Sequence, residues 1–474
     1  MASHIRILRH YIHTPYLIIA ACEAVLVVAG VYIGYWLRYQ DSDIVTSSHP
    51  VTAVVYAVIV LFGMVAMGVY GSHVREGYVG MTLRTAVAIF LIASMGSGIV
   101  FYFLPDLAIW RGTLAISAVA SFVLIAMFRW FALSVLDLDN LKRRVLVLGT
   151  GSRAEKIASR MRRRYDQRAF LIHGYIPFEQ TADRVTQHGG AILTLDEPLN
   201  VLCNRERIDE IVVALDERRR NREHSAGLPL EELLECRLSG IDVCDVQAFI
   251  EREAGKLDIE LLQPSWMVFS DGFIRGTWRT ASKRAFDLAA SIGLLVVAWP
   301  FMLLAAFAIW FESGFKGPIL YRQQRVGLDS RYFEVTKFRS MRTDAEIDGQ
   351  AVWASVDDPR VTRVGGFLRR SRIDELPQIF NVLKGDMSFV GPRPERPEFV
   401  GDLQTKIPYY VHRHRIKPGL TGWAQLCYPY GASLEDAREK LQYDLYYLKN
   451  HSILLDLIIL IQTVDVVLVG DGAR

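Results

Sequence analysis

Four apolar stretches in the first third of the chain constrain its fold more than any other feature. The first contains a single charged residue, Glu23, and the other three contain none. Each is close to the roughly 20 residues that a helix needs to cross the hydrocarbon core of a membrane. They predict a transmembrane helix bundle over residues 1–140, with Glu23 either functional or, as we favour, near the end of its helix. The stretches are Tyr16–Trp36, Val51–Tyr70, Ala86–Leu104 and Gly112–Phe128.

Lysine and arginine are unevenly distributed over the loops that flank these stretches. They outnumber acidic residues before the first stretch, between the second and third, and after the fourth, whereas the other two loops are acidic or nearly neutral. Loops rich in Lys and Arg stay on the cytoplasmic side of a membrane. The N-terminus and everything after the fourth stretch are therefore expected in the cytoplasm. The net charge of only +3 over 474 residues argues against nucleic acid as a partner.

Residues 141–265 alternate between short apolar runs and polar stretches of helical character. This alternation predicts a small Rossmann-like α/β domain with a parallel sheet. The stretch Gly149-Thr-Gly-Ser-Arg-Ala154 matches the GxGxxA turn of dinucleotide-binding domains, which alone is a weak signal. We favour a scaffold without a cofactor or a catalytic role, and a bound nucleotide or nucleotide-sugar effector is the alternative. The expected strands are Arg144–Gly149, Ala169–Ile176, Ile208–Leu215 and Gly240–Val246.

A fifth apolar stretch, Leu288–Phe311, is long enough to cross a membrane but has Pro300 in its middle. Proline removes a backbone donor and kinks a helix. Basic residues stand at both ends of the stretch, so both ends favour the cytoplasmic side. We therefore expect a re-entrant helix-break-helix over residues 283–312 in preference to a crossing helix. The basic residues are Lys283, Arg284, Lys316, Arg322 and Arg325.

The nonapeptide Arg369–Pro377, RRSRIDELP, places two carboxylates among arginines. Proline is tolerated in the first turn of a helix, so we expect a helix that begins at Asp374 and holds Asp374 and Glu375 at its positive end. Ten arginines lie between Arg322 and Arg372, and arginine forks match phosphate oxygens. Carboxylates beside phosphate-binding arginines indicate Mg²⁺ or Mn²⁺, with one carboxylate free to attack phosphorus. An N-capping aspartate with surface ion pairs is the alternative.

Two later segments add groups that suit a phosphorylated substrate. Arg393 lies between Pro392 and Pro394, which stiffen its loop and favour a fixed phosphate contact. Further along, basic residues precede a Gly-rich turn and an aromatic residue, so that stacking on a nucleobase and packing at the lipid headgroups are both open. The residues of this second segment are His412, Arg413, Arg415, Lys417 and Trp423.

The second half of the chain resembles the bacterial polyprenyl-phosphate hexose-1-phosphate transferases, which are monotopic phosphoglycosyl transferases. The resemblance covers roughly 40% of the chain. Four apolar stretches followed by a Rossmann-like domain are similar to the long members of that family. The motifs that carry it are Lys283-Arg284-x-x-Asp287, Gly317-Pro318 through Gly327, Lys337-Phe-Arg339-Ser-Met341, Asp374-Glu375-Leu-Pro-Gln378, Asn381 through Ser388, and Gly391-Pro-Arg393-Pro394.

The resemblance implies a mostly α-helical catalytic domain over residues 279–474, with a re-entrant membrane hairpin that carries Pro300. Asp374 would attack the β-phosphate of a UDP-hexose, release UMP and keep the phosphosugar until undecaprenyl phosphate accepts it. Glu375 would bind the metal with Asp374. Arg393 would hold the substrate phosphate, supported by the residues Arg372, Arg325 and Arg339. The resemblance also implies a homodimer whose catalytic domain lies on the cytoplasmic face of the bacterial inner membrane. Its reaction would be the first step in the synthesis of exopolysaccharide or O-antigen repeat units.

Two features near the C-terminus qualify this expectation. Where many relatives follow TGWAQ with Asn-Gly-Arg, this chain continues from Gln425 with Leu-Cys-Tyr-Pro-Tyr-Gly431, which resembles an exopolysaccharide-associated subset. We expect UDP-glucose as the donor, with UDP-galactose as the alternative. The apolar stretch Ser452–Gly470 contains Asp456 and Asp465, and we expect it to associate with the membrane without crossing it.

Two other functional classes compete with this interpretation. A metal-dependent glycosyltransferase with a DxD motif is one, because Asp41-Ser-Asp43 and Asp137-Leu-Asp139 fit that pattern. A non-catalytic membrane scaffold or nucleotide sensor is the other, with the Rossmann-like domain as its working part. Release of UDP would favour the first rival, and full function without the carboxylate of Asp374 would favour the second.

Overall fold

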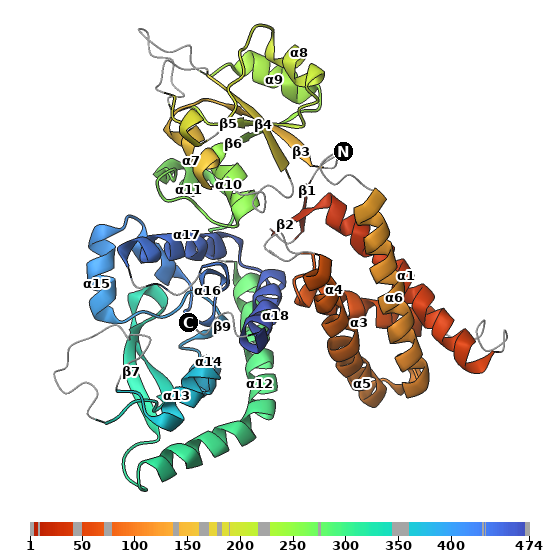
Figure 1. Cartoon of the computed structure of the whole chain (residues 1–474). Coiled ribbons are helices and arrows are strands. Elements are labelled where there is room, and N and C mark those ends of the chain that lie inside the picture. The colour runs from red at the N-terminus through yellow and green to blue at the C-terminus, as the bar shows by residue number, and fades with distance from the viewer. Residues whose placement is uncertain are drawn as a thin grey trace. The chain divides into compact units, whose positions relative to one another are not determined.

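The computed structural model divides the chain into two compact units, residues 1–7 with 11–254 and residues 8–10 with 255–474 (Figure 1). We describe each unit by itself. The structure describes residues 4–7, 10–40, 50–70, 78–135, 142–160, 170–177, 183–188, 190–216, 228–273, 276–343, 360–428, 431 and 433–469. The aspartates of both DxD patterns lie outside these residues.

The first unit begins with apolar helices, preceded by the short strands β1 (His4–Ile7) and β2 (His10–His13). Three helical segments, Leu17–Tyr39, Val79–Phe103 and Arg111–Ala132, are long and apolar enough to cross a membrane, which confirms three of the expected stretches in the first unit. The helices are α1 (Thr14–Tyr39), α3 (Pro50–Ala66), α4 (Tyr78–Ala86), the π-helix η1 (Val87–Ala93), α5 (Ser94–Phe103), the short 3₁₀ helix η2 (Pro105–Leu107) and α6 (Arg111–Val135).

The second expected stretch forms a shorter helix than the sequence suggested. Helix α3 ends at Ala66 and has 17 residues. The reason is Gly68, which adopts a φ of +67° and turns the chain out of the helix. Its amide donates to the carbonyl of Val65 at 3.0 Å, and the amide of Val69 donates to the carbonyl of Met64 at 3.0 Å, so the end of the helix is closed by the chain itself.

A buried ion pair joins the first and last helices of this bundle. Glu23 of α1 has no exposed surface, and its Oε1 lies 2.5 Å from Nε of Arg129 on α6. Nη1 of Arg129 also donates to Oγ1 of Thr85 on α4 at 2.6 Å. Gly30 and Gly34 of α1 lie directly against serines of α6, which lets the two backbones approach closely. Glu23 is therefore neutralised inside the bundle by the protein, and does not reach out to a headgroup.

The remainder of the first unit is a four-stranded parallel sheet in the order β4-β3-β5-β6 (Figure 1). Its strands coincide with the four that the sequence predicted. The central strands are buried on both faces, as expected for a sheet covered by helices. The elements are β3 (Arg143–Leu148), α7 (Ser152–Arg160), β4 (Phe170–Ile176), η4 (Thr186–His188), α8 (Leu199–Arg205), β5 (Glu210–Val213), α9 (Leu230–Leu238), β6 (Asp242–Asp245) and α10 (Val246–Ala254).

The GxGxxA turn between β3 and α7 is closed by a carboxylate of the chain itself. Asp216, just after β5, accepts hydrogen bonds from the amides of Ser152 at 2.8 Å and Arg153 at 2.9 Å, and from the hydroxyl of Ser152 at 3.0 Å. A Cβ at Gly151 would collide with this carboxylate, and Gly149 has a φ of +115°. The carboxylate thus occupies the helix N-terminus where dinucleotide-binding domains receive a phosphate.

The second unit combines helices with an antiparallel hairpin, β7 paired with β8, and a parallel pair, β9 with β10. Its elements are α11 (Pro264–Phe269), α12 (Thr277–Glu312), β7 (Leu320–Val326), η5 (Leu328–Ser330), β8 (Tyr332–Phe338), α13 (Arg363–Arg370), η6 (Ile373–Gln378), α14 (Ile379–Lys384), β9 (Ser388–Val390), α15 (Pro397–Lys406), η7 (Tyr410–Arg415), β10 (Gly419–Thr421), α16 (Trp423–Cys427), α17 (Leu434–Asn450) and α18 (Ile453–Val469).

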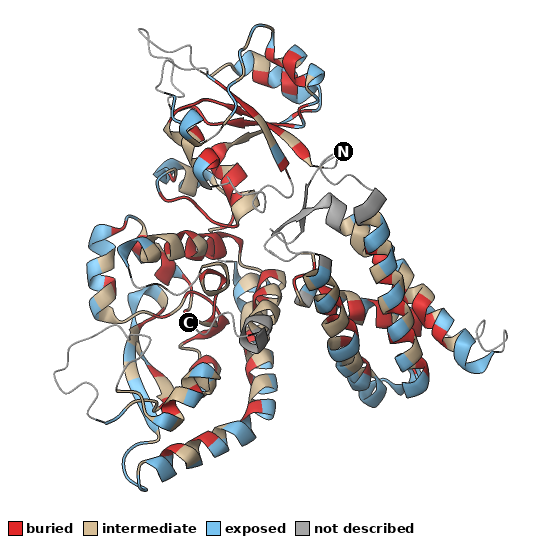
Figure 2. Ribbon diagram, in the orientation of Figure 1, coloured by how far each residue is buried: buried red, intermediate tan, exposed pale blue. Residues whose placement is uncertain are grey.

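Helix α12 is the fourth helix that is long and apolar enough to cross a membrane. It runs over 36 residues with Pro300 inside it, and Figure 1 shows it bent partway along its length. The bend agrees with the missing donor of a proline, although the two halves form one continuous helix and not two separate ones. Many of its apolar side chains are exposed, as the pale blue segments of Figure 2 illustrate: Val296, Val297, Trp299, Phe301, Leu303, Leu304, Phe307 and Phe311.

Three residues near the start of α12 tie it to the rest of the unit. Nζ of Lys283 lies 2.8 Å from Oδ2 of Asp456 on α18. Arg284 donates to the carbonyls at the end of α14, at 2.6 and 2.7 Å. Oδ1 of Asp287 accepts hydrogen bonds from Oγ of Ser388 at 2.9 Å and from the amide of the next residue at 3.0 Å. The charged residues that were expected to flank a membrane hairpin thus anchor the start of α12 to the rest of the second unit.

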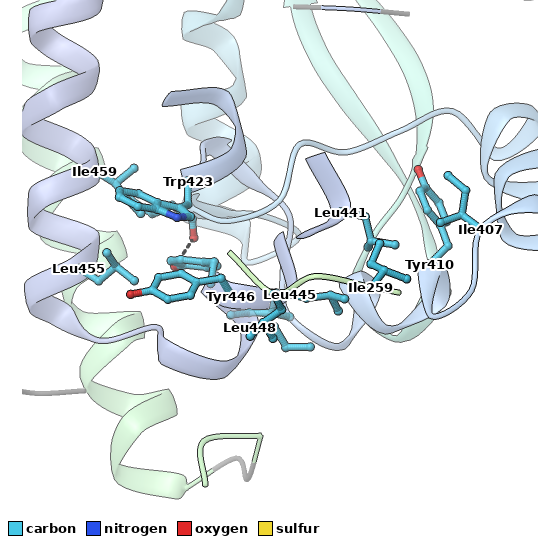
Figure 3. Packing of buried hydrophobic residues seen from close by; sticks show 14 of the residues in the cluster. Ile259, Ile407, Tyr410, Trp423, Leu441, Leu445, Tyr446, Leu448, Leu455 and Ile459 are labelled. Atoms are coloured by element: carbon cyan, nitrogen blue, oxygen red, sulfur yellow. Dashed lines mark hydrogen bonds between the residues drawn. The ribbon is translucent and has the colours of Figure 1, made fainter. Parts of the chain in front are cut away.

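The core of the second unit lies between α16, α17 and the start of α18 (Figure 3). The indole of Trp423 is stacked on Tyr446 at a centroid distance of 6.0 Å, and its Nε1 donates to the carbonyl of Gly255 at 2.8 Å. Leu455 and Ile459 of α18 are fully buried in the same cluster. Residues 255–262, which were predicted to belong to the α/β domain, also pack in this cluster of the second unit.

Candidate active site

A small pocket forms where the β7–β8 hairpin meets η6 and the loop after β9. Lys337 comes from β8, Glu375 from η6, and Arg393 from the loop. Two basic side chains therefore contact one carboxylate, and Arg325 adds a third cation to the lining. Such an arrangement attracts a phosphate while keeping an anionic group in place. The pocket is lined by Arg325, Val335, Lys337, Glu375, Gln378, Arg393, Pro394, Gly419 and Leu420.

The two carboxylates lie at the start of a helical segment, as expected, but its geometry differs in detail. The segment begins at Ile373, one residue earlier than predicted, after Arg372 in a left-handed conformation with a φ of +58°. Residues up to Gln378 form the 3₁₀ helix η6, and α14 follows directly. Pro377 explains this, because it has no amide with which to close an α-helical turn onto Ile373.

Asp374 differs from Glu375 in having a carboxylate oxygen that no described residue contacts by a hydrogen bond. Its side chain is 8% exposed, and its Oδ1 is buried with no hydrogen-bond partner among the described residues. Burial, and next the charge of Glu375, raise the pKa of Asp374 to about 6, against the opposing effects of Lys337, Arg369 and Arg372. At neutral pH the group is therefore mostly ionised, weakly solvated and basic for a carboxylate, which suits a nucleophile.

Glu375 differs from its neighbour because the protein compensates its charge. Its Oε1 lies 2.8 Å from Nζ of Lys337 and 3.4 Å from Nη2 of Arg393. Burial would raise the pKa of Glu375, but Lys337 and Arg393 hold this pKa well below its ordinary value. The two adjacent carboxylates thus have clearly separated properties, which is the usual sign of distinct chemical roles.

The donor set fits the expected divalent cation. Among the described residues, no group of three or more His, Cys, Asp or Glu side chains is placed to hold a metal. Magnesium is commonly bound by one or two carboxylates, with phosphate and water oxygens completing its shell. Asp374, whose Oδ1 has no hydrogen-bond partner among the described residues, and Glu375 beside it would be that pair of oxygen donors.

The expected phosphate-binding arginines do not all lie in the pocket. Arg393 and Arg325 line it. However, Nη1 of Arg325 donates to the carbonyl of Pro394 at 3.1 Å and Nη2 to the side chain of Gln323 at 2.6 Å, so this arginine also serves the fold. Arg372 is exposed beside η6. Nη1 of Arg339 is buried without a hydrogen-bond partner in the described part of the chain.

Trp423 and Arg413, expected at a nucleobase or a lipid headgroup, are core residues. Trp423 is 4% exposed and packed on Tyr446, so its ring has no free face for a base. Arg413 is 5% exposed and paired with Asp444 at 2.8 Å. That expectation is not supported for these two residues, because both side chains are consumed by contacts within the protein.

The other three residues of that segment remain at or near the surface. His412 stacks on Tyr409 at a centroid distance of 6.0 Å, and burial lowers its pKa. Arg415 is exposed and pairs with Asp329 at 3.6 Å. Lys417 is half-buried, and burial, followed by the charge of Arg284, lowers its pKa. None of the three lines the pocket described above.

Lys337 is the functional residue that sequence reasoning missed. It lies within one of the family motifs, but its role did not follow from the motif. The sequence feature that could have indicated this role is the position of Lys337 near the end of β8, between the buried residues Val335 and Phe338. A lysine in such a position needs a carboxylate partner, and the partner stands 38 positions further along the chain.

Comparison with known proteins identifies the second unit. Residues 278–470 match the model of a family described as bacterial sugar transferase. The exopolysaccharide production protein PSS of Rhizobium leguminosarum bv. phaseoli is 43% identical over 188 residues, which are 38% of this chain and 92% of that protein.

Two longer relatives extend the similarity. The UDP-N-acetylgalactosamine-undecaprenyl-phosphate N-acetylgalactosaminephosphotransferase of Aeromonas hydrophila is 41% identical over 242 residues, 51% of this chain and 56% of that protein. The undecaprenyl-phosphate glucose phosphotransferase of Komagataeibacter xylinus is 37% identical over 332 residues, 69% of this chain and 59% of that protein. The chain thus spans little more than half the length of these two relatives.

Proposed function

The chain belongs to the bacterial sugar transferase family, and on that premise we propose that it transfers a sugar 1-phosphate from a UDP-sugar to undecaprenyl phosphate and releases UMP. One observation carries the proposal beyond family membership. The buried carboxylate of Asp374 has an oxygen without a hydrogen-bond partner among the described residues. It adjoins a glutamate that is held by Lys337 and Arg393. This difference supports Asp374 as the nucleophile and Glu375 as its electrostatic support.

In the first step, a carboxylate oxygen of Asp374 attacks the β-phosphorus of the UDP-sugar. The new bond joins that oxygen to phosphorus, and the bond between phosphorus and the oxygen bridging to the α-phosphate breaks. UMP leaves with the electron pair of the broken bond. Arg393 and Lys337 hold the phosphate oxygens, because both cations line the pocket together with Glu375, the residue that follows Asp374 in the chain. The product is an acyl phosphate that carries the sugar.

In the second step, a phosphate oxygen of undecaprenyl phosphate attacks the phosphorus of this acyl phosphate. The bond to Asp374 breaks, the carboxylate is regenerated, and a lipid-linked diphosphosugar leaves. Asp374 and Glu375 would hold Mg²⁺ or Mn²⁺, which supplies positive charge at the phosphates when bound. Splitting one transfer into two displacements lets the soluble donor and the lipid acceptor use the same site in turn.

The lipid acceptor requires a site close to the membrane surface. We propose that α12 enters and leaves the same leaflet, so that the pocket faces the headgroups from the cytoplasm. The bend in α12, its exposed apolar side chains and the basic residues at both of its ends support this placement. A homodimer at the inner membrane remains part of the proposal, as does a scaffolding role for the α/β domain.

The sugar is the least constrained part of the proposal. We propose UDP-glucose, supported by the relative of Komagataeibacter xylinus, whose name specifies glucose and whose similarity covers 69% of this chain. UDP-N-acetylgalactosamine is the second candidate, because the relative of Aeromonas hydrophila bears that sugar in its name. Both donors should be offered in parallel, together with UDP-galactose.

The test uses the full chain in lipid nanodiscs with Mg²⁺, undecaprenyl phosphate and each donor. We expect release of UMP. In enzyme quenched during turnover, we also expect the peptide that contains Asp374 to be heavier by the mass of one phosphosugar. Release of UDP would instead support a glycosyltransferase. An active enzyme with no trace of the adduct, even when the acceptor is withheld, would contradict the two-step mechanism.

A further inference from the structure

The loop that carries Arg393 is held through its carbonyl groups. Pro392 and Pro394 have no amide N–H, so this loop cannot build regular backbone pairing around Arg393. Instead, four consecutive carbonyls each accept a hydrogen bond from a different donor. Gly419 N donates to Pro392 O at 2.9 Å, Arg413 Nη2 to Arg393 O at 3.1 Å, Arg325 Nη1 to Pro394 O at 3.1 Å, and Val326 N to Glu395 O at 3.0 Å.

The donor at Arg393 itself is a buried arginine that is fixed from three sides. Nε and Nη2 of Arg413 lie 3.0 and 2.8 Å from Oδ2 of Asp444 on α17. Nη1 donates to the hydroxyl of Tyr410 at 2.9 Å, which leaves Nη2 directed at the carbonyl of Arg393. The planar guanidinium has donors in a fixed fork, so the ion pair with Asp444 determines where that Nη2 points.

We propose that Arg413, held by Asp444, is a positioning residue that sets the place of Arg393 opposite Glu375, rather than a ligand of nucleotide or lipid. Two features support this. Arg413 is buried, and the three groups that accept its hydrogen bonds all belong to the protein. The carbonyl it holds belongs to the same residue whose guanidinium reaches Glu375 at 3.4 Å. Arg325 holds the next carbonyl in the same way.

A positioning role of this kind matters because the contact between Arg393 and Glu375 is long and partly exposed to solvent. Its Nη2 is 3.4 Å from Glu375, a long contact, and 36% of its side chain is exposed. Whether the guanidinium reaches Glu375 depends on where the backbone places the Cα of Arg393. A shift of about 1 Å at a group that binds the reacting phosphate costs about 100-fold in rate.

The inference rests on the proposed function and is tested by a double-mutant cycle in the full chain. Removing Arg413 alone would strand a buried aspartate, so the pair is replaced together as Arg413→Met with Asp444→Leu, a change that is often tolerated by folding. Arg413→Lys is the second variant, since it keeps the charge but loses the fork. The cycle combines each with Arg393→Ala. The matched control is Arg438→Met with Glu260→Gln, an exposed pair at 3.4 Å that involves the same helix α17.

With UMP release as the measurement, the paired variant is expected to lower kcat/KM about 100-fold while its melting temperature stays near that of the wild type. On the Arg393→Ala background the same change is expected to cost less than about 3-fold, because its effect passes through Arg393. Should the paired variant melt early, Arg413→Lys provides the same comparison. Equal losses on both backgrounds, or wild-type activity in both variants, would overturn the inference. A wild-type chain that releases no UMP would reject the proposed function itself, so the two failures are distinguishable.

Discussion

Nζ of Lys337 lies 2.8 Å from Oε1 of Glu375. The ammonium group of this β8 residue therefore compensates the charge of the carboxylate next to Asp374. Without this contact, two adjacent carboxylates in a buried place would repel each other, and one of them would take up a proton. With it, Glu375 stays ionised and Asp374 retains an ionised form near neutral pH. The pair of carboxylates and the lysine thus form one electrostatic unit of three residues.

This relationship predicts the effect of Lys337→Met. The lysine lowers the pKa values of both Asp374 and Glu375, so its removal raises both. The acid limb of kcat/KM against pH should therefore move to higher pH than in the wild type, and kcat/KM at pH 7 should fall by roughly tenfold. Lys406→Met, which removes an exposed lysine of α15, is the control. An unchanged pH profile in the Lys337 variant would contradict this account.

The wild-type enzyme should itself lose activity in mild acid. Because burial raises the pKa of Asp374 to about 6, protonation removes the nucleophile below that pH, and kcat/KM should fall about tenfold per pH unit there. The stability of the folded protein should respond to pH in the opposite direction. A raised pKa contributes stability that is present at low pH and lost as pH rises through about 6. A pH profile of UMP release checks the first statement, and an acid limb near pH 4 would refute it.

Asp374→Asn tests the nucleophile directly. An amide is a poor nucleophile toward phosphorus, and we expect kcat to fall at least about a thousandfold. The fold should persist, because the variant removes a charge that burial disfavours. Asp402→Asn, at an exposed position of α15, is the matched control. Substantial charging of undecaprenyl phosphate by the Asp374 variant, measured with radiolabelled donor, would exclude the covalent route.

The closed GxGxxA turn predicts a local effect in the α/β domain. Asp216→Ala removes the acceptor for the amides of Ser152 and Arg153, and losing a capping acceptor costs about 0.5–2 kcal/mol. Deuterium exchange of peptides over α7 should therefore become faster, whereas UMP release should stay within about twofold of the wild type. In the wild type, saturating NAD⁺ should leave the exchange of α7 unchanged. Protection of α7 by NAD⁺ would show that a dinucleotide displaces Asp216.

Local sequence patterns determined the elements of this fold better than they determined its contacts. The four parallel strands and three of the four N-terminal spans follow from apolar runs and from the turn residues that end them. Both signals depend on only a few neighbouring residues. The same holds for the placement of Asp374 and Glu375 at a helix start, which Pro377 signals. The length of helix α3 was overestimated because a single glycine, Gly68, turns the chain out of the helix.

Contacts between distant segments could not be read from such patterns. Lys337 and Glu375 are 38 positions apart, and Arg413 and Asp444 are 31. An arginine beside a glycine-rich turn has the same local signature whether it faces a ligand or a buried aspartate. Arg413 was therefore expected at a ligand, whereas the structure shows it buried and hydrogen-bonded to Asp444 and to the carbonyl of Arg393.

The pairing of Glu23 with Arg129 imposes an order on biosynthesis. The two residues are separated by 106 positions, so the ribosome delivers α1 long before the arginine that neutralises it exists. A lone carboxylate is costly in hydrocarbon. We therefore expect the first helix to reach its final place in the bundle only after the last helix has been translated.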